Sequence, residues 1–250
     1  MAEIRLRNVW VRYPIYEAHR SFRVALLSRP VGGIIGRTSS KSIPHVTALQ
    51  GIDLALSDGV RLGLVGHNGA GKSTLIKVLG GIFEPSLGEV HVSGRTATLI
   101  AMGLGMDPDD TGYENIVNCG LYLGMTPAEI AERTPEIAEF TELGDFLDLP
   151  LKTYSSGMVV RLAFAVTTAV APDIIIMDEG IGAGDARFAK KAKERLERMI
   201  DACSIMVLAS HSRELIADLC TEAALLDRGR IIRRGPVADV LQHYEELSRT

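Results

Sequence analysis

Alternating apolar and polar positions mark two strands near the start of the chain. Residues 4–11 place apolar side chains on one face and arginines on the other, and residues 46–56 repeat this alternation. A period of two is typical of a strand with one buried face. The dipeptide Tyr13-Pro14 ends the first strand, because proline cannot donate a ladder hydrogen bond.

The segment between these strands, residues 14–44, differs in composition and is predicted to be an insert. Residues 16–27 have the spacing of a basic amphipathic helix, and the prolines, glycines and serines of residues 30–41 predict a flexible loop. The basic side chains could face anionic lipid headgroups or a pyrophosphate-linked glycan, or the helix could be solvated and pack its apolar side on the core. The basic residues are Arg20, Arg23, Arg29, Arg37 and Lys41.

Beyond the second strand, short apolar runs alternate with segments of helical period, which indicates an α/β fold. The predicted strands are residues 60–65, 174–177 and 204–209. The predicted helices are residues 74–79, 156–170, 186–200 and 213–219. Two hairpins are expected, one over residues 89–100 with its turn at Gly94, and one over residues 223–233 with its turn at 227–229.

Residues 107–151 form a different kind of stretch, acidic and helical in period. Four prolines punctuate it, namely Pro108, Pro127, Pro135 and Pro150. We therefore predict a helical subdomain over about residues 107–165, inserted into a single α/β domain that spans residues 1–250. The chain has no internal repeat that would indicate a tandem pair of such domains.

Composition narrows the possible functions. With 250 residues, 46% of them hydrophobic, the chain can bury a large core. Its net charge of -4 argues against a general nucleic-acid binder. It lacks an apolar run long enough to cross a membrane, a signal peptide, and cysteine spacing typical of a disulfide framework or a zinc site. We expect a soluble cytosolic chain that only another protein would hold at a membrane.

Residues 66–73 read Gly-His-Asn-Gly-Ala-Gly-Lys-Ser, the pattern of a phosphate-binding loop between a strand and a helix. Its glycines let the backbone approach phosphate oxygens, and its N–H groups and the start of the helix attract the anion. Lys72 supplies a charge for the β- and γ-phosphates, and Ser73 offers its hydroxyl to Mg²⁺. The loop therefore predicts a nucleoside triphosphate site.

Two later strands end in side chains that suit the same chemistry. Asp178 is predicted to hold Mg²⁺ and Glu179 to polarise the attacking water. His211 follows the next strand, where an imidazole could bridge the γ-phosphate and the water, although a histidine after a strand is often incidental. Residues 154–158 place Ser-Ser-Gly at the start of a helix, where an ordinary N-cap is the simpler explanation.

These motifs, in this order and at these separations, resemble the ATPase subunit of an ABC transporter over nearly the whole chain. The residues that carry the resemblance are Gly66 to Ser73, Tyr154 to Met158, Ile174 to Glu179, Gly184-Asp185 and His211. The signature Tyr-Ser-Ser-Gly-Met, the sequence of residues 111–116 and the insert after Tyr13 resemble the ATPases that export O-antigen, teichoic acid, capsule or cell-wall galactan. Residues 101–105 depart from the family pattern, because they lack the glutamine that usually touches Mg²⁺.

The resemblance implies a P-loop NTPase (RecA-like) core, an antiparallel β subdomain and the inserted helical subdomain. It implies a head-to-tail homodimer, with ATP between Lys72 of one copy and Ser155 and Gly157 of the other, and Asp185 at the seam. Tyr13 is the leading candidate to stack on adenine and Tyr16 a weaker one, unless the aromatic ring only packs. The predicted nucleotide contacts are Tyr13, Gly66, His67, Asn68, Gly69, Ala70, Gly71, Lys72, Ser73, Thr74, Tyr154, Ser155, Ser156, Gly157, Met158 and Asp185; the predicted metal ligands are Ser73 and Asp178, and the predicted catalytic residues are Glu179 and His211.

The resemblance also implies a separate transmembrane subunit, expected as a dimer, that docks near residues 106–123. The cargo would be a lipid-linked polysaccharide, with no nucleic acid involved, and the chain would sit at the cytoplasmic face of the membrane through that subunit. No C-terminal carbohydrate-binding domain is expected after Thr250. A soluble ABC-type ATPase acting on nucleic acid or the ribosome is the alternative, but it would carry a coiled-coil insertion or a second ATPase unit. A phosphate-loop kinase would have no use for the signature at residues 154–158.

Overall fold

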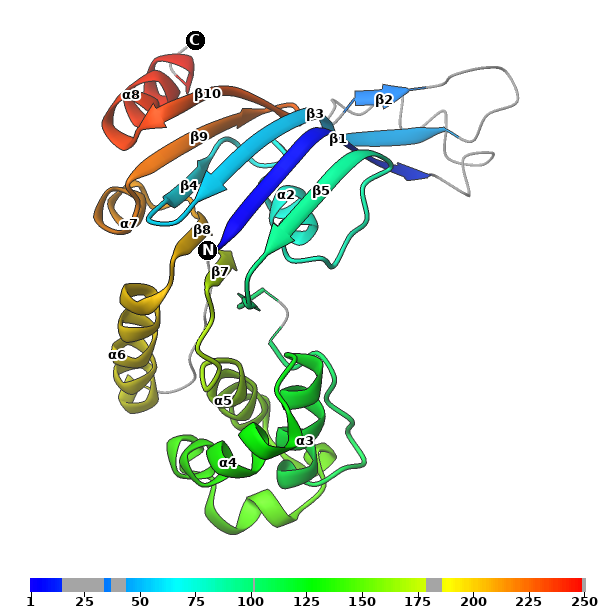
Figure 1. Ribbon diagram of the computed structural model, residues 1–250, viewed down its shortest axis with the longest axis vertical. Coiled ribbons are helices and arrows are strands. Elements are labelled where there is room, and N and C mark those ends of the chain that lie inside the picture. The colour runs from blue at the N-terminus through cyan, green and yellow to red at the C-terminus, as the bar shows by residue number, and fades with distance from the viewer. Residues whose placement is uncertain (15–33, 37–43, 101, 179–185, 249–250) are drawn as a thin grey trace. The chain divides into compact units, whose positions relative to one another are not determined.

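The structure is a computed structural model that describes residues 1–14, 34–36, 44–100, 102–178 and 186–248 (Figure 1). The chain divides into two compact units. The first unit comprises residues 1–94, 177–179 and 204–250, and the second comprises residues 95–176 and 180–203.

An antiparallel sheet of four strands forms one part of the first unit. Its order is β2 (Ile34–Gly36), β3 (His45–Ser57), β1 (Glu3–Pro14) and β5 (Leu87–Ser93) (Figure 1). The predicted strands at residues 4–11 and 46–56 are confirmed, with Pro14 at the end of β1. The pairing shifts register between Leu6 and Val9, so both side chains stay buried on the same face.

Two predictions about this sheet need correction. The loop predicted over residues 30–41 contains the short strand β2, which pairs with residues 45–47 of β3. Residues 89–100 do not form a hairpin, because β5 pairs with β1 whereas β6 (Thr96–Thr98) pairs in parallel with β7 (Ile174–Asp178). A turn residue such as Gly94 reverses the chain direction but does not choose the partner of the next strand. The helix predicted over residues 16–27 lies outside the described residues.

A second group of strands in the first unit surrounds β4 (Arg61–Val65). β8 (Ile205–Ala209) and β9 (Glu222–Asp227) flank β4 and run parallel to it. All five residues of β8 are buried, as expected for a strand covered on both faces. The helix α2 (Lys72–Leu79) follows β4 and contacts β3, β5 and β8, so it packs against both sheets of the unit.

β9 and β10 (Arg230–Pro236) form the last hairpin, as the sequence predicted. Arg228 and Gly229 form its turn, with φ of 45° and 78°, the left-handed conformation that a tight two-residue turn requires. α7 (Arg213–Leu219) precedes this hairpin, and α8 (Val237–Ser248) follows it and contacts both of its strands. α7 was predicted from the sequence, whereas α8 was not.

The second unit contains most of the helices, and the predicted helical subdomain lies within it. Its elements are α3 (Gly112–Tyr122), α4 (Pro127–Thr141), the short 3₁₀ segments Gly144–Asp148 and Leu151–Thr153, α5 (Ser156–Thr167) and α6 (Ala186–Ala202). Thr111 with Glu114, and Thr126 with Glu129, form capping boxes that start α3 and α4.

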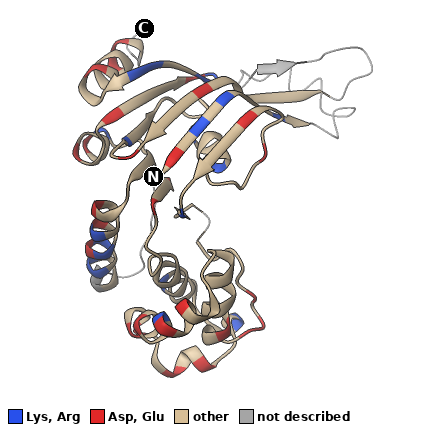
Figure 2. Cartoon of the chain, in the orientation of Figure 1, with Lys and Arg blue, Asp and Glu red and all other residues tan. Residues whose placement is uncertain are grey.

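The core of the second unit is built around three aromatic rings. Phe140, Phe164 and Phe188 come from α4, α5 and α6, and their ring centroids lie 5.6 to 6.1 Å apart. Pro135, one of the four prolines of this stretch, lies inside α4, because packing of that helix outweighs the one lost hydrogen bond. The exposed part of α6 carries lysines and arginines together with acidic residues (Figure 2).

Candidate functional site

A cavity of about 280 Å³ lies beside the phosphate-loop sequence, and all of its lining residues belong to the first unit. The residues that line it are Tyr13, Val46, Ala48, Asn68, Gly69, Ala70, Gly71, Lys72, Ser73, Thr74, Asp178, Ser210 and His211. The fold therefore brings nine residues of the predicted site together with Asp178 from the end of β7. Val46, Ala48 and Ser210 were not predicted, since small or apolar side chains give no chemical signal in a sequence.

Two glycines of the loop are required by its geometry. Gly66 has φ of 149°, and a Cβ atom there would lie 2.3 Å from the carbonyl oxygen of Leu226. Gly71 has φ of 111°, and a Cβ atom there would lie 2.9 Å from the carbonyl oxygen of Ala48. Both the backbone angle and the space exclude a side chain. The loop can therefore fold tightly between β4 and α2.

The start of α2 fits an anion. The helix begins at Lys72 immediately after Gly71, no side chain caps its first turn, and that turn contains no acidic residue. The first N–H groups of a helix have no partner within it, and they carry the positive end of its dipole. Because Ser73 and Thr74 line the cavity, a phosphate group there would meet these donors directly.

The side chain of Lys72 folds back onto the phosphate loop that precedes it. This side chain is buried, and its ammonium group lies 2.5 Å from the carbonyl oxygen of Gly66 and 3.2 Å from that of His67. A buried ammonium group that lines a cavity is well placed to bind an anion that enters it. These residues fit a triphosphate.

The β9–β10 turn supports the phosphate loop from outside. Gly229 donates its N–H to the carbonyl of Ala70 (2.8 Å), and Gln50 donates its own N–H to the carbonyl of Gly229 (2.8 Å). The Gln50 side chain also donates to the carbonyl of Arg228 (2.8 Å). We call this set of contacts, together with the pair of His67 and Asp227, the loop brace.

The pair in the loop brace joins the imidazole of His67 to the end of β9. The Nε2 atom of His67 lies 2.8 Å from Oδ1 of Asp227, and its Nδ1 atom lies 2.7 Å from the carbonyl oxygen of Asn68. The side chain of His67 therefore contacts the hairpin, although its place in the loop led us to predict a nucleotide contact. Asp227 was not predicted from the sequence as a functional residue, because 160 residues separate it from its partner His67.

Tyr13 is one of the residues that line the cavity. Its hydroxyl group is 3.4 Å from the hydroxyl oxygen of Thr74, and its ring packs edge-on against Phe83 with centroids 5.8 Å apart. Val46, which is paired with Tyr13 across β1 and β3, and Ala48 add apolar lining, which suits a flat base. The alternative candidate, Tyr16, lies outside the described residues.

Asp178 and His211 line the cavity from the ends of two strands. Asp178 is the last residue of β7, and His211 follows the end of β8. Ligands of α/β proteins bind at this carboxyl end of the strands. Glu179 and Asp185, which were predicted to act here and at the dimer seam, lie outside the described residues, as does Ala101 in the segment that lacks glutamine.

The signature sequence lies in the second unit at the start of α5. Ser155 is the N-cap, and its hydroxyl accepts the N–H of Met158 at 3.3 Å, as the simpler explanation predicted. Ser155, Gly157 and Met158 also line a cavity of about 400 Å³ in this unit, together with Glu142, Leu143, Phe146 and Arg161. The two predicted parts of the nucleotide site thus each border a cavity of their own unit.

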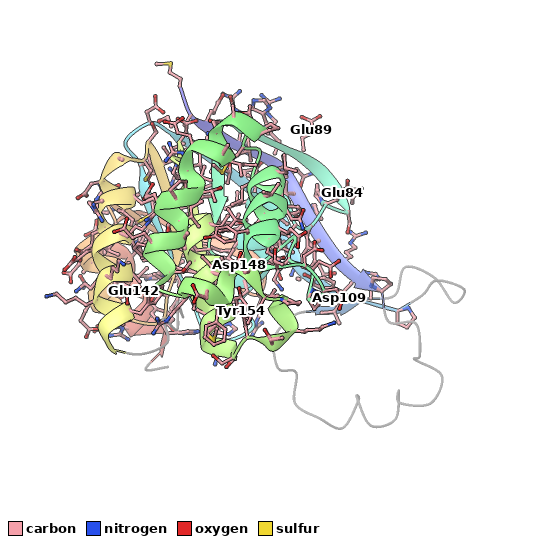
Figure 3. All side chains as sticks on the ribbon, turned by 90° about the horizontal axis from the view of Figure 1, so that it is seen from below. Glu84, Glu89, Asp109, Glu142, Asp148 and Tyr154 are labelled. Carbon is pink, nitrogen blue, oxygen red and sulfur yellow. The ribbon has the colours of Figure 1, made fainter. Side chains whose placement is uncertain are left out.

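The half-buried side chain of Tyr154 packs against other residues of the second unit (Figure 3). Its hydroxyl donates to the carbonyl of Phe146 at 2.5 Å, and its ring packs edge-on against the ring of the same residue. Burial and the nearby carboxylate of Asp148 raise the pKa of Tyr154, which keeps its hydroxyl protonated as a donor. A Cβ atom at Gly112 would come within 2.4 Å of this hydroxyl group. The Tyr154 side chain thus packs within its own unit, and its contact with a nucleotide stays a prediction.

None of the helices among the described residues is both long and apolar enough to cross a lipid bilayer.

Comparison with known proteins gives consistent matches. A family model described as ABC transporter matches residues 49–182. An O-antigen export system ATP-binding protein of Yersinia enterocolitica is 47% identical over 92% of this chain and 97% of its own length. A second O-antigen export ATP-binding protein, from Myxococcus xanthus, is 42% identical over 84% of this chain, and the matching region spans 48% of that relative, about half its length.

Solved structures show the same fold. A dimeric ATP-binding cassette in a post-hydrolysis state, bound to ADP and phosphate, aligns with 94% of this chain and 98% of its own, with a TM-score of 0.64 and 19% identity. This likeness confirms the predicted fold, a P-loop core with an antiparallel β subdomain and a helical subdomain.

Proposed function

The chain belongs to the ABC transporter family, and from this membership we propose that it is the ATP-hydrolysing subunit of an exporter that moves a lipid-linked polysaccharide across the cytoplasmic membrane. The observation that carries the proposal is the phosphate loop at the uncapped start of α2, in a chain 47% identical to an O-antigen export ATP-binding protein. The net charge of -4 gives no support to an ATPase that acts on nucleic acid.

Within the site, each lining residue has a proposed role. The loop N–H groups and Lys72 bind the phosphates, and Tyr13 stacks on the adenine. Ser73 and Asp178 would hold Mg²⁺, which neutralises phosphate charge when it is bound. His211 orients the γ-phosphate, and Glu179 accepts a proton from the attacking water. The position of these side chains around one cavity supports the roles of all but Glu179, for which the sequence is the support.

The complete nucleotide site is proposed to form between two copies of the chain. Ser155 and Gly157 of one copy would face the γ-phosphate bound by Lys72 of the other, with Asp185 at the seam. Two observations support this arrangement: the signature residues border an open cavity in the second unit, and a similar fold has been solved as a dimer with ADP and phosphate.

The proposed membrane partner is a separate transmembrane subunit, also dimeric, that keeps the chain at the cytoplasmic face. Tyr113, Val117 and Leu121 follow one another at intervals of four on α3, so they form one stripe, and they are 40%, 42% and 50% exposed. An exposed apolar stripe of this kind supports docking of an apolar helix from a partner. It falls within residues 106–123, where the sequence predicted the docking surface.

Co-purification tests the proposed function. The full chain, tagged and expressed in its native cell, should retain a membrane protein and a lipid-linked sugar that mass spectrometry identifies. A Lys72→Ala variant should abolish ATPase activity and stop export of the surface polysaccharide. Retention of ribosomes or nucleic acid, with ATPase activity that they stimulate and no membrane partner, would overturn the proposal.

A further inference from the structure

A second cavity of about 280 Å³ lies in the second unit and shares no residue with the nucleotide site. It is bordered by α4, α6 and the segment that follows α5. Its charged lining consists of three arginines and one carboxylate: Arg133, Arg195, Arg198 and Glu136. The cavity thus gathers an excess of positive charge in a chain whose net charge is negative.

Arg195 forms the buried wall of this cavity. Its residue is only 9% exposed, and its guanidinium group lies 4.3 Å above the ring of Phe140. Its Nη1 atom pairs with Oε1 of Glu136 at 2.9 Å, and its Nε atom donates to the carbonyl of Thr168 at 3.3 Å. These contacts fix the plane of the guanidinium group, so the direction of its donors is set before any ligand binds.

The charges of the cavity are not balanced. Burial lowers the pKa of Arg195, and the charges of Arg198 and Arg133 lower it further, whereas Glu136 raises it. All three guanidinium groups line this one cavity, and among its lining residues only Glu136, whose side chain is 56% exposed, is acidic. An added anion would offset this excess of positive charge.

Hydrogen bonds to the end of α5 account for the positions of only two of the three arginines. Arg133 donates to the carbonyl of Ala169 at 2.8 Å and Arg195 to that of Thr168, so both stabilise the negative end of that helix. Arg198 donates to the carbonyl of Glu194 on its own helix, so its bond does not hold α5. Arg198 therefore lines the cavity without holding α5.

We propose that this cavity binds the phosphate group of a small molecule through Arg133, Arg195 and Arg198. A guanidinium group presents five N–H donors in a planar fork that matches two oxygens of a phosphate. Three such groups around one cavity, with one of them fixed by burial, suit a dianion better than a single carboxylate. The ligand is either inorganic phosphate or a phosphate ester such as a glycerophosphate headgroup.

Methyl NMR on the full-length chain tests this site. Met199 lines the cavity, so its methyl group, labelled with ¹³C, reports on what occupies it. Titration with inorganic phosphate and, separately, with glycerol 3-phosphate should shift this resonance. The compound that binds more tightly shows whether the ligand is inorganic phosphate or a phosphate ester. Arg198→Ala should weaken binding at least tenfold, because it removes a charge-assisted contact. Phosphate bound at the loop of the first unit would not respond to this variant.

Two further variants separate a ligand site from a purely structural cluster. Lys193→Ala removes an exposed charge from the same helix outside the cavity lining, and it should bind phosphate as the parent does. Glu136→Gln removes the carboxylate that competes for Arg195, and it should strengthen binding several-fold, an effect that no structural role predicts. A Met199 resonance that phosphate does not shift, or that shifts equally in Arg198→Ala, would overturn the proposal.

Discussion

At the scale of single residues, the loop brace is the feature that the sequence concealed. The phosphate loop could be predicted from its sequence, because only glycine tolerates the backbone angles at Gly66 and Gly71. The contact between His67 and Asp227 could not be predicted, since no feature of the sequence near either residue links the two. An aspartate beside a turn is ordinary in a sequence. Its contact with the loop exists only once β9 lies beside β4.

The loop brace leads to a prediction about Asp227. Asp227→Asn weakens the contact with His67, so the loop will hold its shape less firmly and KM for ATP should rise several-fold while kcat changes little. Steady-state ATPase kinetics measure both constants. The double variant with His67→Ala should be no worse than the worse single variant, because the two side chains act as one pair. Asp218→Asn, on the exposed side of α7, is the matched control. Additive effects of the two changes would contradict the pairing.

At the scale of elements, helix starts were visible in the sequence and strand partners were not. The threonines and glutamates at the starts of α3 and α4 form local capping boxes, and the turn at Arg228 and Gly229 is equally local. The pairing of β5 with β1 is not a local feature, since about eighty residues separate the two strands. Other strands show the same alternation of apolar and polar residues. Pro135 lies inside α4, where tertiary packing outweighs the local preference of proline for a helix end.

The start of α4 should make stability depend on pH. The backbone N–H of Thr126, followed by Arg95 and the Thr126 hydroxyl, lowers the pKa of Glu129 from 4.5 to about 2. Because this pKa is lowered, the ionised carboxylate of Glu129 adds to the stability of the fold. Its stabilisation is complete above about pH 4.5 and is lost as the pH falls toward 2. In Glu129→Gln, the free energy of unfolding should therefore fall less over this window than in the parent. Denaturant titrations at several pH values measure it, with Glu132→Gln as the control on the same helix.

The exposed stripe of α3 gives a prediction about the partner. Leu121→Glu places a charge in an apolar contact, so it should abolish co-purification of the transmembrane subunit. Folding should be nearly unchanged, since Leu121 is 50% exposed and surface substitutions usually alter stability by less than about 0.5 kcal/mol. ATPase activity of the isolated chain should also persist. Leu247→Glu, at 49% exposure on α8, tests whether any exposed leucine has this effect. Full retention of the partner by Leu121→Glu would remove α3 from the interface.

At the scale of the whole molecule, the sequence predicted the class of fold and most of the cavity lining. This was possible because several motifs in a fixed order along the chain indicate one kind of chemistry, which few folds can support. The signature and the phosphate loop border different cavities in the two units, and the sequence alone could not reveal this.

The shared site gives a prediction about turnover. Glu179→Gln should bind ATP, accumulate as a dimer and hydrolyse ATP at least a hundredfold more slowly, because the proton acceptor is lost while the phosphate contacts remain. Size-exclusion chromatography with ATP and a phosphate-release assay measure the two effects. Ser155→Arg in the same background should prevent the dimer if the signature residues face a second copy. A fully active Glu179→Gln variant would remove Glu179 from this role.

The hairpin that grips the phosphate loop also determines how the site meets its first nucleotide. Gly229 and Gln50 hold the loop in shape through backbone hydrogen bonds that need no ligand. A segment that is already bent loses little freedom when a triphosphate settles on it, so the entropic penalty of association is small. The free energy of the phosphate contacts is therefore spent on holding the nucleotide and not on shaping the loop.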